Sequence, residues 1–170
     1  MKNVIENDEI PQITTPYFKF YELEAMCAMG RFDDVKKMME NYWGGMLAQG
    51  AVTFWEEFDP EKKPEEQYEM YGDPFGKSFC HAWAASPIYL LGRYFAGIQL
   101  TDTAYKTFTV KPETETFEIM DCTFPVKGGL VHVQWDEKTL TVESSVSGGI
   151  LIYGGKEYAL EPGKMVQTTK

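Results

Sequence analysis

The residues best suited to chemistry lie in two short segments of the chain. The first, GAVTFWEEFDP (residues 50–60), places the adjacent carboxylates Glu56 and Glu57 directly after Trp55, and the second, CHAWAASP (residues 80–87), holds His81 and Trp83. Aromatic rings pack on the C–H faces of sugars, and carboxylates move protons at the glycosidic carbon. If the fold brings the two segments together, they suit a sugar-processing pocket.

Each of these residue types also has an ordinary structural use. Pairs of Glu are common on solvated loops, and Trp is usually a core residue, which is the interpretation for Trp43 and Trp135. A single His such as His81 is typically a hydrogen-bonded core residue. His132 alternates to the polar side of its expected strand and indicates no function.

Motifs for other chemistries are not found. The sequence contains no HExxH, no CxxC pair and no GxSxG, and its two histidines lie far apart. The run Gly154-Gly155-Lys156 lacks the loop length and the following Ser or Thr of a phosphate loop, so it is interpreted as a hairpin turn. We therefore expect neither a metal site nor a cofactor.

The three cysteines, Cys27, Cys80 and Cys122, are spread over three segments and suggest no disulfide framework, so they are expected to be free, buried thiols. The first residues lack the basic and apolar regions of a signal peptide, which favours a cytoplasmic location for the chain as it stands. A C-terminal fragment of an exported, periplasmic enzyme would also lack its signal, so both locations stay open.

Composition excludes two classes of partner. The chain has 170 residues, 44% of them hydrophobic and 15% aromatic, and a formal net charge of −10. Nucleic acid is excluded, because binding phosphate backbones requires clustered Lys and Arg, and here the basic residues are outnumbered and scattered. A membrane-spanning segment is excluded, because no apolar run is long enough.

Periodicity predicts helices followed by strands. Apolar residues recur at helical spacing over 17–29, 32–47 and 78–95, with Pro87 kinking the third helix or starting its second half. The first of these is apolar almost all round, so it must be covered on more than one side. Residues 50–77 form a long acidic connection, a length that is more often functional than idle.

From residue 105 the period changes to two. Alternating pairs or triplets appear at Phe108 and Val110, at 131–135, at 140–142, and at Ile150 and Ile152, separated by Gly-, Pro- and Asp-containing turns. Several short strands at this spacing predict an antiparallel sandwich or an open barrel. The expected class is therefore α+β in several parts.

Four motifs in this order and spacing resemble the C-terminal part of bacterial inverting α-L-rhamnosidases: TPYFKFYELEAM, GAVTFWEEFDP, CHAWAASPIYLLGRY and TVKP. The resemblance implies that the chain carries the last helices of a six-hairpin (α/α)6 barrel followed by a β-sandwich. The corresponding domains are a polar lead-in over 1–14, partial toroid helices with the acidic loop over 15–100, and an antiparallel β-sandwich over 101–170.

The resemblance also implies roles for particular residues. In the GA-x-T-x-WE pattern the Glu directly after Trp is the general base, which here is Glu56, while His81 corresponds to a His beside the sugar subsite. Trp55 and Trp83 would line the same pocket as substrate-binding residues. Glu57 would either support the residues of the site from behind or lie at the surface. The family's general acid belongs to an earlier part of the barrel, to which no segment of this sequence corresponds.

The expected function is therefore part of a glycoside hydrolase that removes terminal α-L-rhamnose with inversion, acting on a rhamnose-containing glycan and inactive without its acid. Two alternatives remain open: a non-catalytic carbohydrate-binding or scaffold module, and one chain of a split hydrolase. The apolar first helix predicts a partner, either a second copy in a homodimer or a chain that supplies the missing N-terminal barrel.

Overall fold

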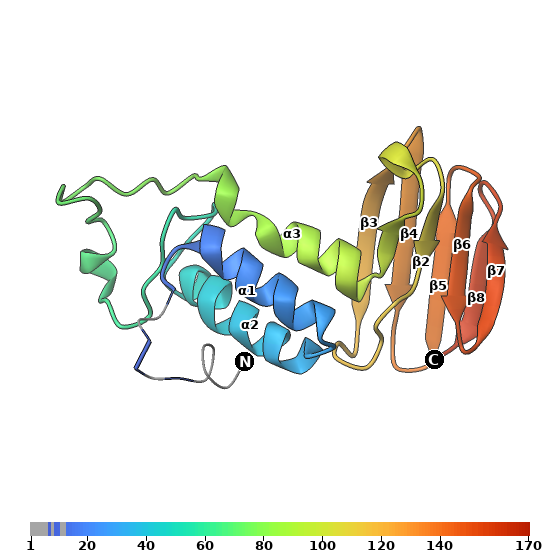
Figure 1. Cartoon of the computed structure of the whole chain (residues 1–170), viewed down its shortest axis with the longest axis horizontal. Coiled ribbons are helices and arrows are strands. Elements are labelled where there is room, and N and C mark those ends of the chain that lie inside the picture. The colour runs from blue at the N-terminus through green and yellow to red at the C-terminus, as the bar shows by residue number, and fades with distance from the viewer. Residues whose placement is uncertain (1–6, 8, 11–12) are drawn as a thin grey trace. The chain divides into compact units, whose positions relative to one another are not determined.

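The computed structural model describes residues 7, 9–10 and 13–170 and confirms the α+β class, with a helical part followed by a part made of sheets (Figure 1). The chain divides into two compact units, Met1–Pro87 and Ile88–Lys170, which are called here the helical unit and the sheet unit. The sequence placed its domain boundary later, between residues 100 and 101. Residues 1–6, 8, 11 and 12 of the predicted lead-in lie outside the described residues.

The helical unit is built on an αα-hairpin. Helices α1 (Pro16–Ala28) and α2 (Phe32–Ala48) lie side by side (Figure 1), close to the predicted ranges 17–29 and 32–47. Gly30 ends α1 with a φ of 72°, and its N–H and that of Arg31 donate to the carbonyls of Cys27 and Met26. This is the Schellman pattern, which satisfies the free carbonyls of a helix end and turns the chain sharply into α2.

Helix α1 is buried on one side and exposed on the other. Leu23 and Met26 are in the core, and Lys19 is also buried, with its Nζ 3.1 Å from the Glu22 carboxylate. The opposite side presents Phe18 and Tyr21, which are 59% and 51% exposed. The helical unit therefore covers only part of the apolar surface that the sequence predicted for this helix.

The third helix is much shorter than the predicted range 78–95. An α-helical turn, α3 (Ser86–Leu90), continues into a wider π-helical turn, η3 (Leu91–Phe95). Residues 78–81 are irregular, with a bend at 79–80, and are followed by a short 3₁₀ turn, η2 (Ala82–Ala84). Proline has no N–H to bond the carbonyl one turn earlier. Pro87 can therefore begin a helix, but within a helix it would remove a hydrogen bond and destabilise it. Of the two predicted roles for Pro87, a kink within the helix or the start of its second half, the structure shows the second, because α3 begins at Ser86.

The sheet unit consists of two four-stranded sheets, with the strand orders β1-β2-β6-β7 and β3-β4-β5-β8. Neighbouring strands are antiparallel except for β2 and β6, which run parallel. The strands are β1 (Ile98–Leu100), β2 (Phe108–Val110), β3 (Met120–Val126), β4 (Gly129–Trp135), β5 (Thr139–Ser144), β6 (Gly149–Tyr153), β7 (Lys156–Leu160) and β8 (Met165–Thr169).

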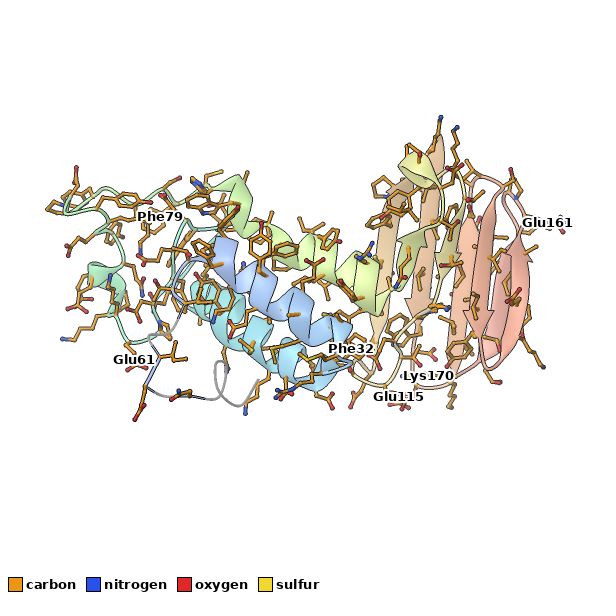
Figure 2. All side chains as sticks on the ribbon, in the orientation of Figure 1. Phe32, Glu61, Phe79, Glu115, Glu161 and Lys170 are labelled. Atoms are coloured by element: carbon orange, nitrogen blue, oxygen red, sulfur yellow. The ribbon has the colours of Figure 1, made fainter. Side chains whose placement is uncertain are left out.

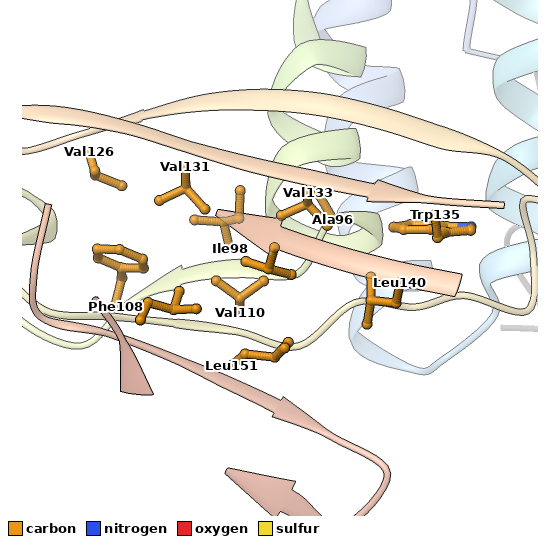
Figure 3. Close-up of a cluster of buried hydrophobic side chains, with 12 residues drawn as sticks. Ala96, Ile98, Phe108, Val110, Val126, Val131, Val133, Trp135, Leu140 and Leu151 are labelled. Carbon is orange, nitrogen blue, oxygen red and sulfur yellow. The ribbon is translucent and has the colours of Figure 1, made fainter. Parts of the chain in front are cut away.

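One hydrophobic core receives side chains from both sheets. Figure 3 shows Val131, Val133 and Trp135 along β4, facing side chains from the other sheet such as Val110 and Leu151. Alternate residues of a strand point to opposite faces, so the predicted period-two pattern becomes a buried face and an outer face. In β6 the buried member is Leu151, whereas the pattern was noted at Ile150 and Ile152, which point the other way.

The turns and cysteines follow the sequence in part. Gly154 and Gly155 both have positive φ in the β6–β7 hairpin, which confirms the turn predicted there. The cysteines are free, with Cys27 buried and Cys122 partly buried, but Cys80 is exposed. The prediction of a buried thiol was wrong for Cys80, which lies at a bend of an irregular segment and not in the predicted helix. Among the described residues, no helix is both long and apolar enough to cross a membrane.

Candidate functional site

The two motif segments lie next to each other in the helical unit. The His81 N–H donates to the Phe54 carbonyl at 2.8 Å, and the Glu56 N–H donates to the Ser78 carbonyl at 2.9 Å. The Thr53 hydroxyl donates to the Phe79 carbonyl. These hydrogen bonds join residues 53–56 to residues 78–81. The acidic loop that joins the two segments is drawn with its side chains in Figure 2, between the labelled Glu61 and Phe79.

The Glu56 carboxylate is buried and hydrogen-bonded at both oxygens. The residue is 7% exposed. Its Oε2 accepts from the Ser78 N–H at 3.0 Å, and its Oε1 accepts from the Tyr71 hydroxyl at 3.3 Å. A buried carboxylate needs such donors to compensate for lost hydration. Each oxygen can accept more than one hydrogen bond, so this carboxylate can still take a proton from a water molecule.

The neighbouring Glu57 is engaged differently. Its Oε1 accepts from the Thr14 hydroxyl at 2.9 Å, and its Oε2 lies 3.5 Å from the Lys77 Nζ, whose side chain is 0% exposed. Burial lowers the pKa of Lys77, and the negative charge of Glu57 opposes that shift. The Lys77 ammonium also donates to the Gln67 side chain at 3.3 Å. Glu57 therefore neutralises a buried cation that anchors the acidic loop.

His81 and Trp83 form an accessible aromatic pair beside Glu56. Their ring centroids are 4.1 Å apart, and Trp83 is 38% exposed. The Trp83 Nε1–H donates to the Glu56 carbonyl at 3.2 Å, and the Tyr17 ring of α1 lies 5.7 Å away, centroid to centroid. An amphipathic ring with an exposed face and a fixed polar edge is the usual means of holding a sugar ring.

Trp55, unlike Trp83, is buried. It is 7% exposed and packs against Phe79 and Phe58, with centroid distances of 4.8 and 6.3 Å. Its ring therefore belongs to the core of the helical unit, and little of it is open to a ligand. Its role in sugar binding remains a prediction. Trp43 is also a core residue, as expected, and its indole N–H donates to the Ala84 carbonyl at 2.8 Å.

Sequence reasoning missed Tyr71, Ser78 and Lys77. The two contacts to the Glu56 carboxylate and the cation beside Glu57 all come from these residues. No motif marked Tyr71, since residues 50–77 were interpreted as one long acidic connection. The pKa of the Tyr71 phenol is raised, first by desolvation and then by the negative charge of Glu56, so the hydroxyl keeps its proton and acts as a donor.

A cavity of about 330 Å³ opens beside these residues. It is lined by Thr15, Glu57, Lys62, Glu69, Met70 and Tyr71. Its charged lining residues are two acids, Glu57 and Glu69, and one base, Lys62. Among the described residues, no group of three or more His, Cys, Asp or Glu side chains could hold a metal ion.

The structure of this chain is similar to that of a solved glycoside hydrolase. The sequence matches no protein-family model and no curated protein. The structure is similar to that of a GH78 family rhamnosidase of Bacillus sp. GL1, with a TM-score of 0.65 and 25% identity over 78% of this chain. That match covers 14% of the rhamnosidase chain, so the present chain spans about one seventh of its length.

A second solved structure, a protein from the human microbiome described as a kojibiose phosphorylase, matches 52% of this chain with 14% identity and a TM-score of 0.37, which is too slight to support an argument. The first match agrees with the family that the four sequence motifs indicated. The resemblance of this chain to the α-L-rhamnosidases, inferred from its motifs, is thus confirmed by its structure.

Proposed function

We propose that this chain is the C-terminal part of an inverting α-L-rhamnosidase-like glycoside hydrolase, with Glu56 as the general base. On this proposal α1, α2 and α3 are the last helices of an (α/α)6 barrel, and the two sheets form the β-sandwich that follows it. The observation that supports the proposal best is the buried, doubly hydrogen-bonded Glu56 carboxylate beside the exposed Trp83 ring, in a chain similar in structure to a rhamnosidase.

The chemistry divides between two groups. In an inverting reaction the base removes a proton from water while the water oxygen bonds the anomeric carbon on the face opposite the leaving group. A separate acid protonates the departing glycosidic oxygen as that bond breaks. Glu56 supplies the first function, and Trp83 and His81 hold the sugar ring and its hydroxyls. The acid comes from a part of the barrel that lies outside this chain.

Two measurements test this proposal. The purified chain should not hydrolyse a nitrophenyl α-L-rhamnoside, because acid and base each contribute on the order of 10²–10⁴ in rate. A chimera in which this chain replaces the equivalent segment of the Bacillus sp. GL1 rhamnosidase should hydrolyse it, with β-L-rhamnose as the first product by NMR. Turnover by the isolated chain that Glu56→Gln abolishes would contradict the proposal, as would a folded chimera without activity.

A second candidate function rests on a different observation, the exposed aromatic side of α1. Phe18 and Tyr21 lie next to Tyr17, whose ring centroid is 5.2 Å from that of Phe18 and 5.6 Å from that of Tyr21. On this candidate the chain is an assembly or scaffold module whose helices pack against a second copy or against helices of another chain. Self-association, or binding of another helical chain, that Phe18→Ser weakens and that brings no catalysis with it would favour this candidate.

A further inference from the structure

Tyr71 lies at the tip of a tight turn in the acidic loop. Met70 and Asp73 exchange two backbone hydrogen bonds, both 3.0 Å long, and the two residues between them, Tyr71 and Gly72, have φ values of 55° and 79°. Two central residues with positive φ are the mark of a type I′ turn. The turn is further fixed by Gly76, where a Cβ would lie 2.5 Å from the Met70 carbonyl oxygen.

Tyrosine is a poor choice for this position. Type I′ turns favour Asn, Asp or Gly at the first central position, because a side chain with a bulky Cβ substituent is strained at positive φ. Packing does not explain the choice, since Tyr71 is 80% exposed. Backbone outliers of this kind persist where a side chain is needed at one place, and they gather at functional sites.

The side chain of Tyr71 is needed at this position because its hydroxyl contacts the Glu56 carboxylate. We propose that Tyr71 is a positioning residue for the Glu56 carboxylate, which rests on the proposed role of Glu56 as the base. The Ser78 N–H donates to Oε2 at 3.0 Å and the Tyr71 hydroxyl donates to Oε1 at 3.3 Å, so both oxygens are held and rotation of the carboxylate is restricted. A base held in one orientation keeps its free lone pair directed at the water, which is the geometry that proton transfer requires.

The surroundings agree with this role. The other charged side chains around the cavity that Tyr71 lines are Glu57, Lys62 and Glu69. Glu57 is turned toward Lys77, at 3.5 Å, so the carboxylate that Tyr71 contacts is Glu56. With the pKa of the phenol raised, Tyr71 remains a neutral donor at neutral pH and does not compete with Glu56 for the proton of the water.

Two substitutions separate positioning from simple structural support. Tyr71→Asn installs the residue that the turn prefers and should raise Tm by about 2–4 °C. Tyr71→Phe keeps the strained backbone and removes only the hydroxyl, so Tm should stay unchanged. In the active rhamnosidase chimera both variants should lower kcat about tenfold, with KM within twofold of the parent. Tyr68→Phe, at another exposed tyrosine of the loop, should change neither value.

The contact itself is tested in the isolated full-length chain. The Tyr71 phenol is titrated by ¹³Cζ NMR, with its signal assigned from Tyr71→Phe. Glu56→Gln should lower its pKa, and Glu57→Gln should lower it less. An unchanged titration in Glu56→Gln, a larger effect of Glu57→Gln, or a lower Tm in Tyr71→Asn would overturn the inference. So would an active chimera whose kcat is indifferent to both Tyr71 changes, whereas a folded but inactive chimera with Tyr71 and Glu56 intact would count against the proposed function instead.

Discussion

The sheet unit and the helical unit bury their apolar side chains to different extents. In the sheet unit Val133 and Leu151 come from opposite sheets and are both 0% exposed in one shared core. In the helical unit α1 buries Leu23 on one side and leaves Phe18 exposed on the other. The candidate site lies in the helical unit, on segments without regular structure. The sheet unit therefore closes its core with its own chain and does not contain the candidate site. The helical unit contains the site and leaves apolar surface available to a partner.

The largest effect expected of any substitution concerns the two adjacent carboxylates of the helical unit. In the rhamnosidase chimera, Glu56→Gln should lower kcat by about 10²–10⁴, because an amide cannot accept the proton of the water. Glu57→Gln should lower kcat far less, since Glu57 binds Lys77 and Thr14. Steady-state kinetics on both variants make the comparison. Equal losses, or a greater loss for Glu57→Gln, would show that the base was assigned to the wrong carboxylate.

The next effect tests whether the sheet unit is the self-contained one. Trp135 is 1% exposed and its indole N–H donates to the Phe117 carbonyl at 2.8 Å. Trp135→Ala should destabilise the sheet unit by about 3–5 kcal/mol, through lost packing and an unpaired carbonyl. Trp83→Ala, at a ring that is 38% exposed, should cost about 1 kcal/mol or less. Urea unfolding followed by amide NMR reports each unit separately, and a similar cost at both positions would remove the contrast.

A smaller effect concerns the open side of the helical unit. At micromolar concentration the chain should self-associate through α1, because burial of exposed aromatic surface is favourable at about 25 cal/mol per Å². Phe18→Ser should weaken the association by about tenfold or more. Leu130→Ser removes a side chain of similar exposure, 52%, from β4 of the sheet unit and should have no effect. Sedimentation velocity decides the matter, and a monomer that binds no hydrophobic dye would show that α1 is already covered.

A different kind of effect is a pH dependence of the helical unit. Burial raises the pKa of the Cys27 thiol from 9.0 to about 12. Because the folded state holds this proton more tightly than the unfolded state, the stabilisation is complete below pH 9 and is lost as the pH rises toward 12. Unfolding free energy should fall with a slope of at most about 1.4 kcal/mol per pH unit in that window. Cys27→Ala should flatten the slope, and an unaltered slope would mean that other groups cause it.

Sequence periodicity predicted the inner strands of both sheets and none of the edge strands. The predicted pairs lie on β2, β6, β4 and β5, which occupy the middle positions in the two strand orders. The four missed strands, β1, β7, β3 and β8, are the edges. An edge strand has one neighbour and more exposed surface, so its sequence need not alternate strictly between apolar and polar residues. In β8, for example, Met165 is 60% exposed.

The candidate site was predictable only as a set of residue types. The motifs identified Glu56, His81 and Trp83, because their sequence context resembles that of a known family. The contacts that hold Glu56 depend on tertiary pairing between residues 53–56 and 78–81, and no local pattern encodes that pairing. Tyr71 was missed for a related reason: its position contradicts the local preference of the turn, so sequence reasoning about the turn points away from it.

The parallel pairing of β2 with β6 has a consequence for how the chain folds during synthesis. Phe108 pairs with Gly149, and the strands between them, β3 to β5, belong to the other sheet. As the chain leaves the ribosome, the β1–β2 hairpin emerges first and has no neighbour until β6 follows. The second sheet can form its hairpins in the meantime, since β3, β4 and β5 are consecutive. Closure of the first sheet is therefore a late, long-range step, and a nascent chain stalled before residue 149 exposes a strand edge that chaperones must shield.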